Sequence, residues 1–76
     1  MIIDLSNKGL KEFDIKEYCL KEDIKLEDVT GLNLSNNNLS KIDIPKELVN
    51  LEWFNLSNNN LSSIDIPKEL VNLYLA

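Results

Sequence analysis

A stretch of 22 residues occurs twice in succession, and this repetition constrains the fold more than any other feature. Residues 32–53 and 54–75 are identical at 18 positions. A partial third copy, residues 3–15, matches residues 32–44 at an offset of 29, so the first unit is seven residues longer. Such units bury their apolar faces only against their neighbours. The sequence therefore predicts one domain, residues 1–76, of three stacked units at about 3–31, 32–53 and 54–75.

Each full copy begins with a segment that alternates apolar and polar residues, Leu32–Ser35 and Phe54–Ser57. This period of two is typical of a strand with one buried face. Equivalent strands of successive units would pair in parallel, about 4.8 Å apart. Asn37 and Asn59 follow the strands at one repeat position, and an asparagine side chain can both donate to and accept from a turn. We expect a structural ladder of these two residues, interrupted at Lys8 in the first copy.

The order of these residues, L-x-x-L-x-L-x-x-N-x-L, resembles the conserved segment of the leucine-rich repeat family. It runs in full from Val29 to Leu39 and from Leu51 to Leu61, with a third copy from Ile3 to Leu10. The resemblance implies an α/β right-handed solenoid with a short parallel β-sheet on its concave face. It also implies a non-catalytic module that binds a protein or peptide there. The subclass of the family stays open.

The remaining part of the first unit differs from that of the other two. Pro45 and Pro67 fix the backbone and bias the preceding isoleucine away from helix, so these stretches should be extended with at most one helical turn. In the longer first unit, Asp14 followed by Glu17 is a capping pattern. We predict one helix on the convex side, from about residue 15 to about residue 23, with Ile15, Tyr18 and Cys19 packed inward.

The composition argues against several classes of partner. The net charge is −5, with eight basic residues and no histidine. Binding to a phosphate backbone needs a positive surface, so we expect no nucleic-acid partner. The chain has no basic stripe and no apolar run long enough for a membrane, so we expect no membrane partner.

The sequence also lacks the usual groups of catalysis. Cys19 has no histidine to activate it and should pack as a small apolar residue. Asp14, Asp43 and Asp65 share one repeat position and could form a column of carboxylates for Ca²⁺. A lysine three residues later in the last two copies favours a solvated edge instead. We predict no enzymatic activity, no metal and no cofactor.

The start of the chain and its single cysteine bear on location. The sequence enters the repeat register at once, which indicates that no signal peptide precedes the fold. One cysteine excludes an internal disulfide and fits a reducing compartment. We therefore expect a cytoplasmic protein.

The concave face is where the repeats differ most. Trp53 replaces Gly31 there, and a tryptophan is a preferred anchor when an interface buries it. The alternative is that Trp53 only covers Gly31. By the 22-residue offset, its neighbour in the next strand would be Leu75. The predicted binding residues are Trp53, Asn55, Ser57, Asn58, Asn33, Ser35 and Asn36.

The alternative hypothesis concerns the end of the chain. The final unit should present apolar side chains, among them Leu56 and Leu70, toward a unit that this sequence does not contain. A strand would also be left with an unpaired edge. The chain would then be an assembly fragment, or a truncated N-terminal piece of a longer repeat protein. The residues predicted for self-association are Leu70, Leu73 and Leu75.

Overall fold

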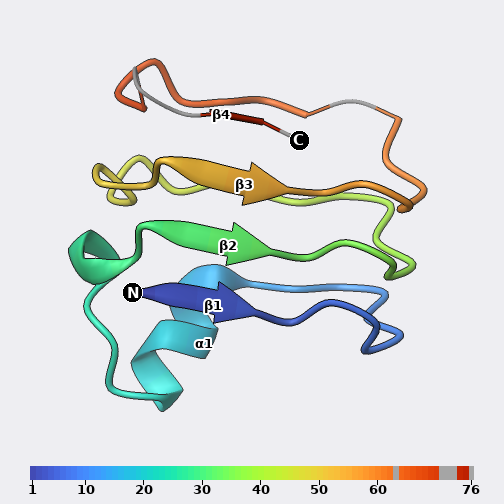
Figure 1. Cartoon of the computed structure of the whole chain (residues 1–76), viewed down its shortest axis with the longest axis horizontal. Helices are drawn as coiled ribbons and strands as arrows, with labels where there is room; N and C mark the ends of the chain where they lie inside the picture. Colours follow the sequence, from blue (N-terminus) through green and yellow to red (C-terminus); the bar gives the residue numbers. More distant parts are fainter. Residues whose placement is uncertain (63, 71–73, 76) are drawn as a thin grey trace.

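Figure 1 shows the computed structural model, which describes residues 1–62, 64–70 and 74–75. In chain order its elements are β1 (Ile2–Asp4), α1 (Ile15–Lys21), the short 3-10 helix η1 (Leu26–Asp28), β2 (Gly31–Asn33), β3 (Trp53–Asn55) and β4 (Tyr74–Leu75). The strands pair in parallel in the order β1-β2-β3-β4. The alternating segments therefore form β1, β2 and β3 of a single small sheet, and β4 at the end of the last unit is its fourth strand. η1 was not expected from the sequence.

The register of the first three strands follows the repeat. Ile3, Leu32 and Phe54 are Cα partners across β1, β2 and β3. The pairing of β3 with β4 is shifted by one residue relative to the 22-residue repeat. Trp53 lies opposite Tyr74, and Phe54 lies opposite Leu75.

The expectation that Trp53 neighbours Leu75 is therefore wrong. A shift of one residue interchanges the two faces of a strand. In the observed register Leu75 is the Cα partner of Phe54, and Tyr74 joins the outer column of Trp53. The two copies also differ at these positions, so sequence identity does not fix the register there.

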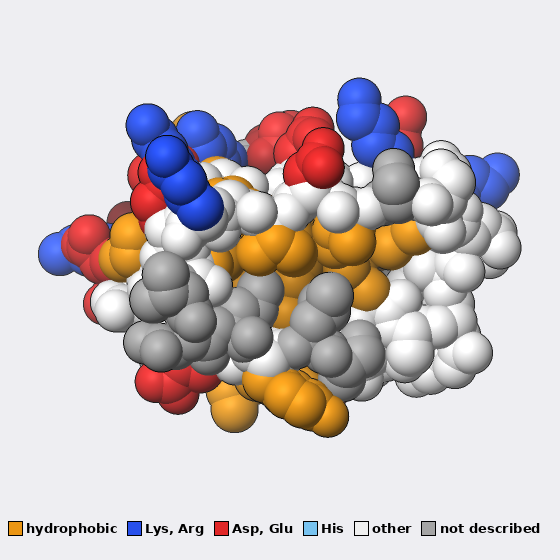
Figure 2. All heavy atoms as spheres, turned by 90° about the horizontal axis from the view of Figure 1, so that it is seen from above, with side chains coloured by type: hydrophobic (Ala, Val, Ile, Leu, Met, Phe, Trp, Pro, Cys, Tyr) orange, Lys and Arg blue, Asp and Glu red, His pale blue; other side chains and the backbone are white. Residues whose placement is uncertain are grey.

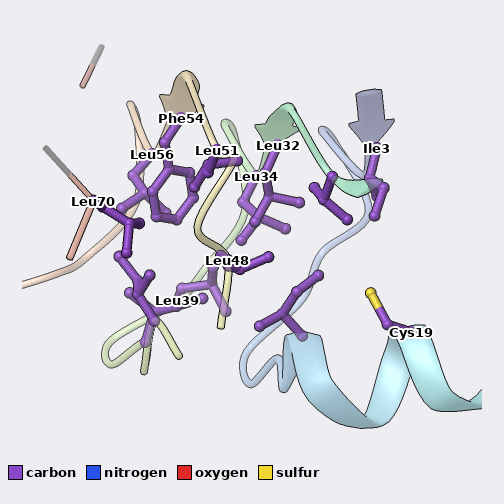
Figure 3. Close-up of a cluster of buried hydrophobic side chains, with 14 residues drawn as sticks. Ile3, Cys19, Leu32, Leu34, Leu39, Leu48, Leu51, Phe54, Leu56 and Leu70 are labelled. Carbon is purple, nitrogen blue, oxygen red and sulfur yellow. The ribbon is translucent and has the colours of Figure 1, made fainter. Parts of the chain in front are cut away.

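The hydrophobic core lies between the sheet and the segments that return from one strand to the next (Figure 3). Leu32 and Phe54 enter it from β2 and β3, Leu48 from a returning segment, and Cys19 from α1. All four side chains are almost completely buried. The core is thus built from the repeated leucine positions of all units together.

Burial is most complete in the middle unit. Leu34 and Leu39 are fully buried, whereas their counterparts Leu5 and Leu10 in the first unit are half-buried. In the last unit Leu61, the counterpart of Leu39, is also half-buried. Identical residues therefore differ in burial according to whether a unit has neighbours on both sides.

Helix α1 forms on the side of the core opposite the sheet, as predicted (Figure 3). Its N-cap is Asp14, whose Oδ1 accepts hydrogen bonds from Lys16 N at 3.0 Å and Glu17 N at 3.2 Å. Ile15 and Cys19 are buried on its inner face, and Tyr18 packs against the core. The helix ends at Lys21, two residues before the expected boundary, and Asp23 follows with a left-handed φ of 56°.

The returning segments are extended with tight turns after the prolines. Leu48 N donates to Pro45 O at 3.2 Å, and Leu70 N donates to Pro67 O at 3.1 Å. An ion pair of 3.6 Å between Lys16 and Glu47 links α1 to the second unit. Among the described residues, no helix has the length and apolar character needed to cross a membrane.

Candidate interaction surface

Asn37 holds the turn of the first unit to that of the second. Its Oδ1 accepts hydrogen bonds from Lys8 N and Leu10 N, both at 3.0 Å. Its Nδ2 donates to Leu5 O at 3.0 Å and to Leu34 O at 2.9 Å. The residue is only 5% exposed. The side chain therefore supplies hydrogen bonds that a buried bent backbone cannot make with itself.

Asn59 repeats this arrangement one unit later. Its Oδ1 accepts from Leu39 N at 3.0 Å, and its Nδ2 donates to Leu34 O at 2.9 Å and to Leu56 O at 3.0 Å. Unlike Asn37, it is half-buried rather than buried, which corrects the expectation that both are buried. The physical reason is its position in the last full unit. Lys8, at this position in the first unit, is exposed.

The polar residues at the ends of the strands form a second set of local hydrogen bonds. Asn33 Oδ1 accepts from Ser35 N at 3.0 Å and from Ser35 Oγ at 2.7 Å. Asn55 binds Ser57 in the same way, at 3.0 and 2.8 Å. In the first unit an aspartate, Asp4, makes the corresponding bonds to Ser6. These hydrogen bonds stabilise the turn that follows each strand.

The next residue of each unit has a left-handed backbone. Asn7, Asn36 and Asn58 have φ values of 58°, 57° and 58°. Asparagine tolerates this region better than most residues. Asn58 Nδ2 also donates to Asn36 Oδ1 at 2.8 Å, so the two exposed side chains are joined across units. The choice of asparagine here therefore has a structural reason of its own.

The outer face of the sheet carries a column of apolar residues. The Cα partners at this register position are Ile2, Gly31, Trp53 and Tyr74. Ile2 is 70% and Tyr74 64% exposed, and Trp53 is half-buried. We call Ile2, Trp53 and Tyr74 the apolar column.

Gly31 allows this column to be continuous. A Cβ atom at Gly31 would lie 3.0 Å from Cγ1 of Ile2 and 3.5 Å from Cε3 of Trp53. The two side chains therefore close over the glycine from both sides. Trp53 covers Gly31, as one interpretation of the sequence proposed, and also retains exposed surface for a contact.

The predicted binding residues are only partly brought together. Asn33, Trp53 and Asn55 lie on the outer face of neighbouring strands. Asn36, Ser57 and Asn58 are exposed in the turns that follow. Ser35 is only 6% exposed, so it offers almost no surface to a partner, and its Oγ donates to Asn33 Oδ1.

Two residues of the apolar column were missing from the predicted set. Ile2 precedes the first buried strand residue, and its place in the alternation could have identified it. Tyr74 could not be identified in this way, because the repeat offset assigns its place to Leu75. Only the observed register brings Tyr74 beside Trp53.

The end of the stack at β4 is less open than the sequence predicts. Leu56 and Leu70 are buried, which overturns their expected exposure, and Leu70 is therefore not a surface contact. Leu73 and the side chain of Leu75 lie outside the described residues. Hydrophobic side chains nevertheless form a strip across this end (Figure 2). Ile66, in the last returning segment, is 36% exposed.

Cys19 is buried, and burial raises the pKa of its thiol. Within the described part of the chain, no three carboxylate, cysteine or histidine side chains are placed to hold a metal ion. A surface depression of about 400 Å³ is open and lies beside α1, with Phe13 and Tyr18 in its wall.

Comparison with known proteins gives one match. The family model described as Leucine Rich Repeat matches residues 28–48 and 50–73. Searches of curated proteins and of solved structures returned no match to this chain. The matched segments include β2, β3 and the asparagine turns that follow them.

Proposed function

Since the chain belongs to the leucine-rich repeat family, we propose that it is a non-catalytic module that binds a protein or peptide on the outer face of its sheet. The observation that carries this proposal is the exposed apolar column of Ile2, Trp53 and Tyr74. Such repeats are commonly protein-binding modules, and the parallel stacked strands support the solenoid form that the family implies.

The column has the chemistry of an interface anchor. Tryptophan and tyrosine provide large contact areas and are enriched among the residues that dominate binding energy. Trp53 is held against Gly31, so little of its rotational freedom remains to be lost when a partner covers it.

Selection from a random peptide library displayed on phage tests this proposal, with the 76-residue chain immobilised as bait. Selected peptides are then titrated while the emission of Trp53, the single tryptophan, is recorded. We expect Trp53→Ala to weaken binding about 30-fold, which corresponds to about 2 kcal/mol for an anchor residue. Tyr74→Ala should weaken it in the same direction.

Leu20→Ala is the matched control, because Leu20 is 82% exposed on α1 across the core from the sheet. Circular dichroism must show that every variant is folded. Peptides that bind Trp53→Ala and Tyr74→Ala as tightly as the parent chain would place the binding surface elsewhere. Failure to select any peptide would contradict the proposed peptide-binding function.

A second candidate function is self-association through the end of the stack at β4. β4 lies at the edge of the sheet, and the apolar strip in Figure 2 crosses this end. An exposed strand edge can pair with another chain. Burial of apolar surface contributes about 25 cal/mol per Å², before the entropy of association is subtracted. A two-fold contact between copies would close on itself.

Sedimentation equilibrium of the 76-residue chain from micromolar to millimolar concentration tests this association. We expect a monomer–dimer equilibrium that Ile66→Glu shifts toward monomer, because a charge would be buried in the contact. Leu20→Glu, on the distant helix, should leave the equilibrium unchanged. A parent chain that is monomeric throughout the range rules the contact out.

A further inference from the structure

A line of polar atoms runs beside the apolar column on the same face of the sheet. Asp4, Asn33 and Asn55 are Cα partners across β1, β2 and β3, two residues beyond the apolar column on each strand. Neighbouring parallel strands are about 4.8 Å apart, and two residues along a strand span about 6.6 Å. The two rows therefore lie close enough for one ligand to touch both.

Each of the three side chains uses only part of its hydrogen-bonding capacity in the turn. Oδ1 accepts from the serine two residues later in all three cases. The other terminal atom, Oδ2 of Asp4 or Nδ2 of Asn33 and Asn55, has no hydrogen-bond partner among the described residues. The line thus offers one acceptor at β1, then a donor at β2 and a donor at β3.

The acceptor at β1 carries a negative charge. Hydrogen bonds from Ser6 N and then from Ser6 Oγ lower the pKa of the exposed Asp4 carboxyl. The nearby Lys8 contributes least to this lowering, and among the described residues it forms no ion pair with Asp4. The other outward residues of β1, β2 and β3 are uncharged, and the chain as a whole has a net charge of −5.

These atoms select the chemistry of a partner. The amide donors of Asn33 and Asn55 suit carbonyl oxygens, and main-chain carbonyls are accessible in an extended segment but already bonded within an α-helix. The carboxylate of Asp4, which forms no ion pair among the described residues, attracts a cation and repels an acidic partner. The apolar column accepts an apolar or aromatic side chain.

We propose that the sheet face binds an extended peptide segment across its strands, with a lysine or arginine at Asp4 and an apolar side chain over Trp53 and Tyr74. The main-chain carbonyls of this segment accept hydrogen bonds from Asn33 and Asn55. This inference rests on the proposed function, because it assigns a partner chemistry to the same face.

The repeat itself supplies the control variants. Asn33 and Asn55 show that an amide at this position preserves the bonds to serine, so Asp4→Asn removes the charge and retains the turn. Asp4 shows in return that a carboxylate makes the same bonds, so Asn33→Asp adds a charge at a tolerated position. Both variants should fold like the parent chain.

The test uses peptides selected from the random phage library and resynthesised. We expect them to combine a basic residue with an apolar or aromatic one. Asp4→Asn should weaken their binding about two- to fivefold, the size of an exposed ion pair. Asn33→Asp should also weaken it, because a carboxylate cannot donate the hydrogen bond that Asn33 Nδ2 gives to a peptide carbonyl. Replacing the basic residue of the peptide with glutamine should weaken binding to the parent chain but not to Asp4→Asn.

Failure of this inference is distinguishable from failure of the proposed function. Peptides that need Trp53 but lack a basic residue, and that bind Asp4→Asn as well as the parent, would overturn the partner chemistry and leave the binding face in place. Selection of acidic peptides would overturn it in the same way. Peptides that are insensitive to Trp53→Ala, or a library that yields no binder, would overturn both.

Discussion

Replacing Leu39 with alanine should lower the free energy of unfolding by about 2–5 kcal/mol, the cost of removing a large side chain from a packed core. Leu39 is fully buried in the middle unit. The surrounding side chains come from units on both sides and can relax only partly into the space. A domain of this size is marginally stable, so this loss is a large share of its total stability.

Leu61→Ala is the matched control, because Leu61 has the same repeat position but is half-buried. It should cost about half as much or less, since less apolar surface is returned to water. Thermal and denaturant unfolding, followed by circular dichroism, compare the two variants. If Leu39→Ala does not fold, the milder Leu39→Val still permits the comparison with Leu61→Val. Equal losses at the two positions would contradict the unequal burial.

Asn37→Ala should destabilise the chain by about 1–3 kcal/mol, because it leaves partly buried backbone groups without partners. The groups that lose their partner are Lys8 N, Leu10 N and Leu5 O in the first unit, whereas Leu34 O in the second keeps its bond from Asn59 Nδ2. The substitution therefore breaks the connection between two units as well as one turn.

Asn59→Ala provides the comparison for this second prediction. Asn59 makes similar bonds but is half-buried, so water can replace part of what is lost and the effect should be smaller. Amide hydrogen exchange gives an independent readout. The amides of Lys8 and Leu10 should lose protection in Asn37→Ala and keep it in Asn59→Ala. An unchanged unfolding midpoint in Asn37→Ala would show that the ladder does not stabilise the fold.

Local rules were sufficient for most of the secondary structure. Alternation placed the strands around Leu32 and Phe54, and the capping pattern at Asp14 placed the start of α1. The end of α1 was less predictable, because it depends on the left-handed turn at Asp23 rather than on helix propensity. The sequence of η1 contains no signal strong enough to predict a helical turn, because its acidic residues suit a loop equally well.

The candidate surface was predictable only in part. The repeat identified Trp53 as the exceptional residue of the outer face, and the asparagines as turn residues. It could not show that Asn33 and Asn55 already use one side-chain oxygen within their own turns. Nor could it place Tyr74 beside Trp53, because the register of β4 departs from the repeat.

The sequence by itself determined what each unit is: a short strand, an asparagine-held turn and an extended return. These features depend on residues close together in the chain, whose periodicity and hydrogen-bonding groups act locally. Only the tertiary structure decided what each copy of a residue does. Asn37 and Asn59, or Leu39 and Leu61, have nearly the same local sequence, yet one of each pair is buried and the other is not. The physical reason is that burial depends on the neighbours stacked above and below a unit, and a residue's own repeat does not contain that information.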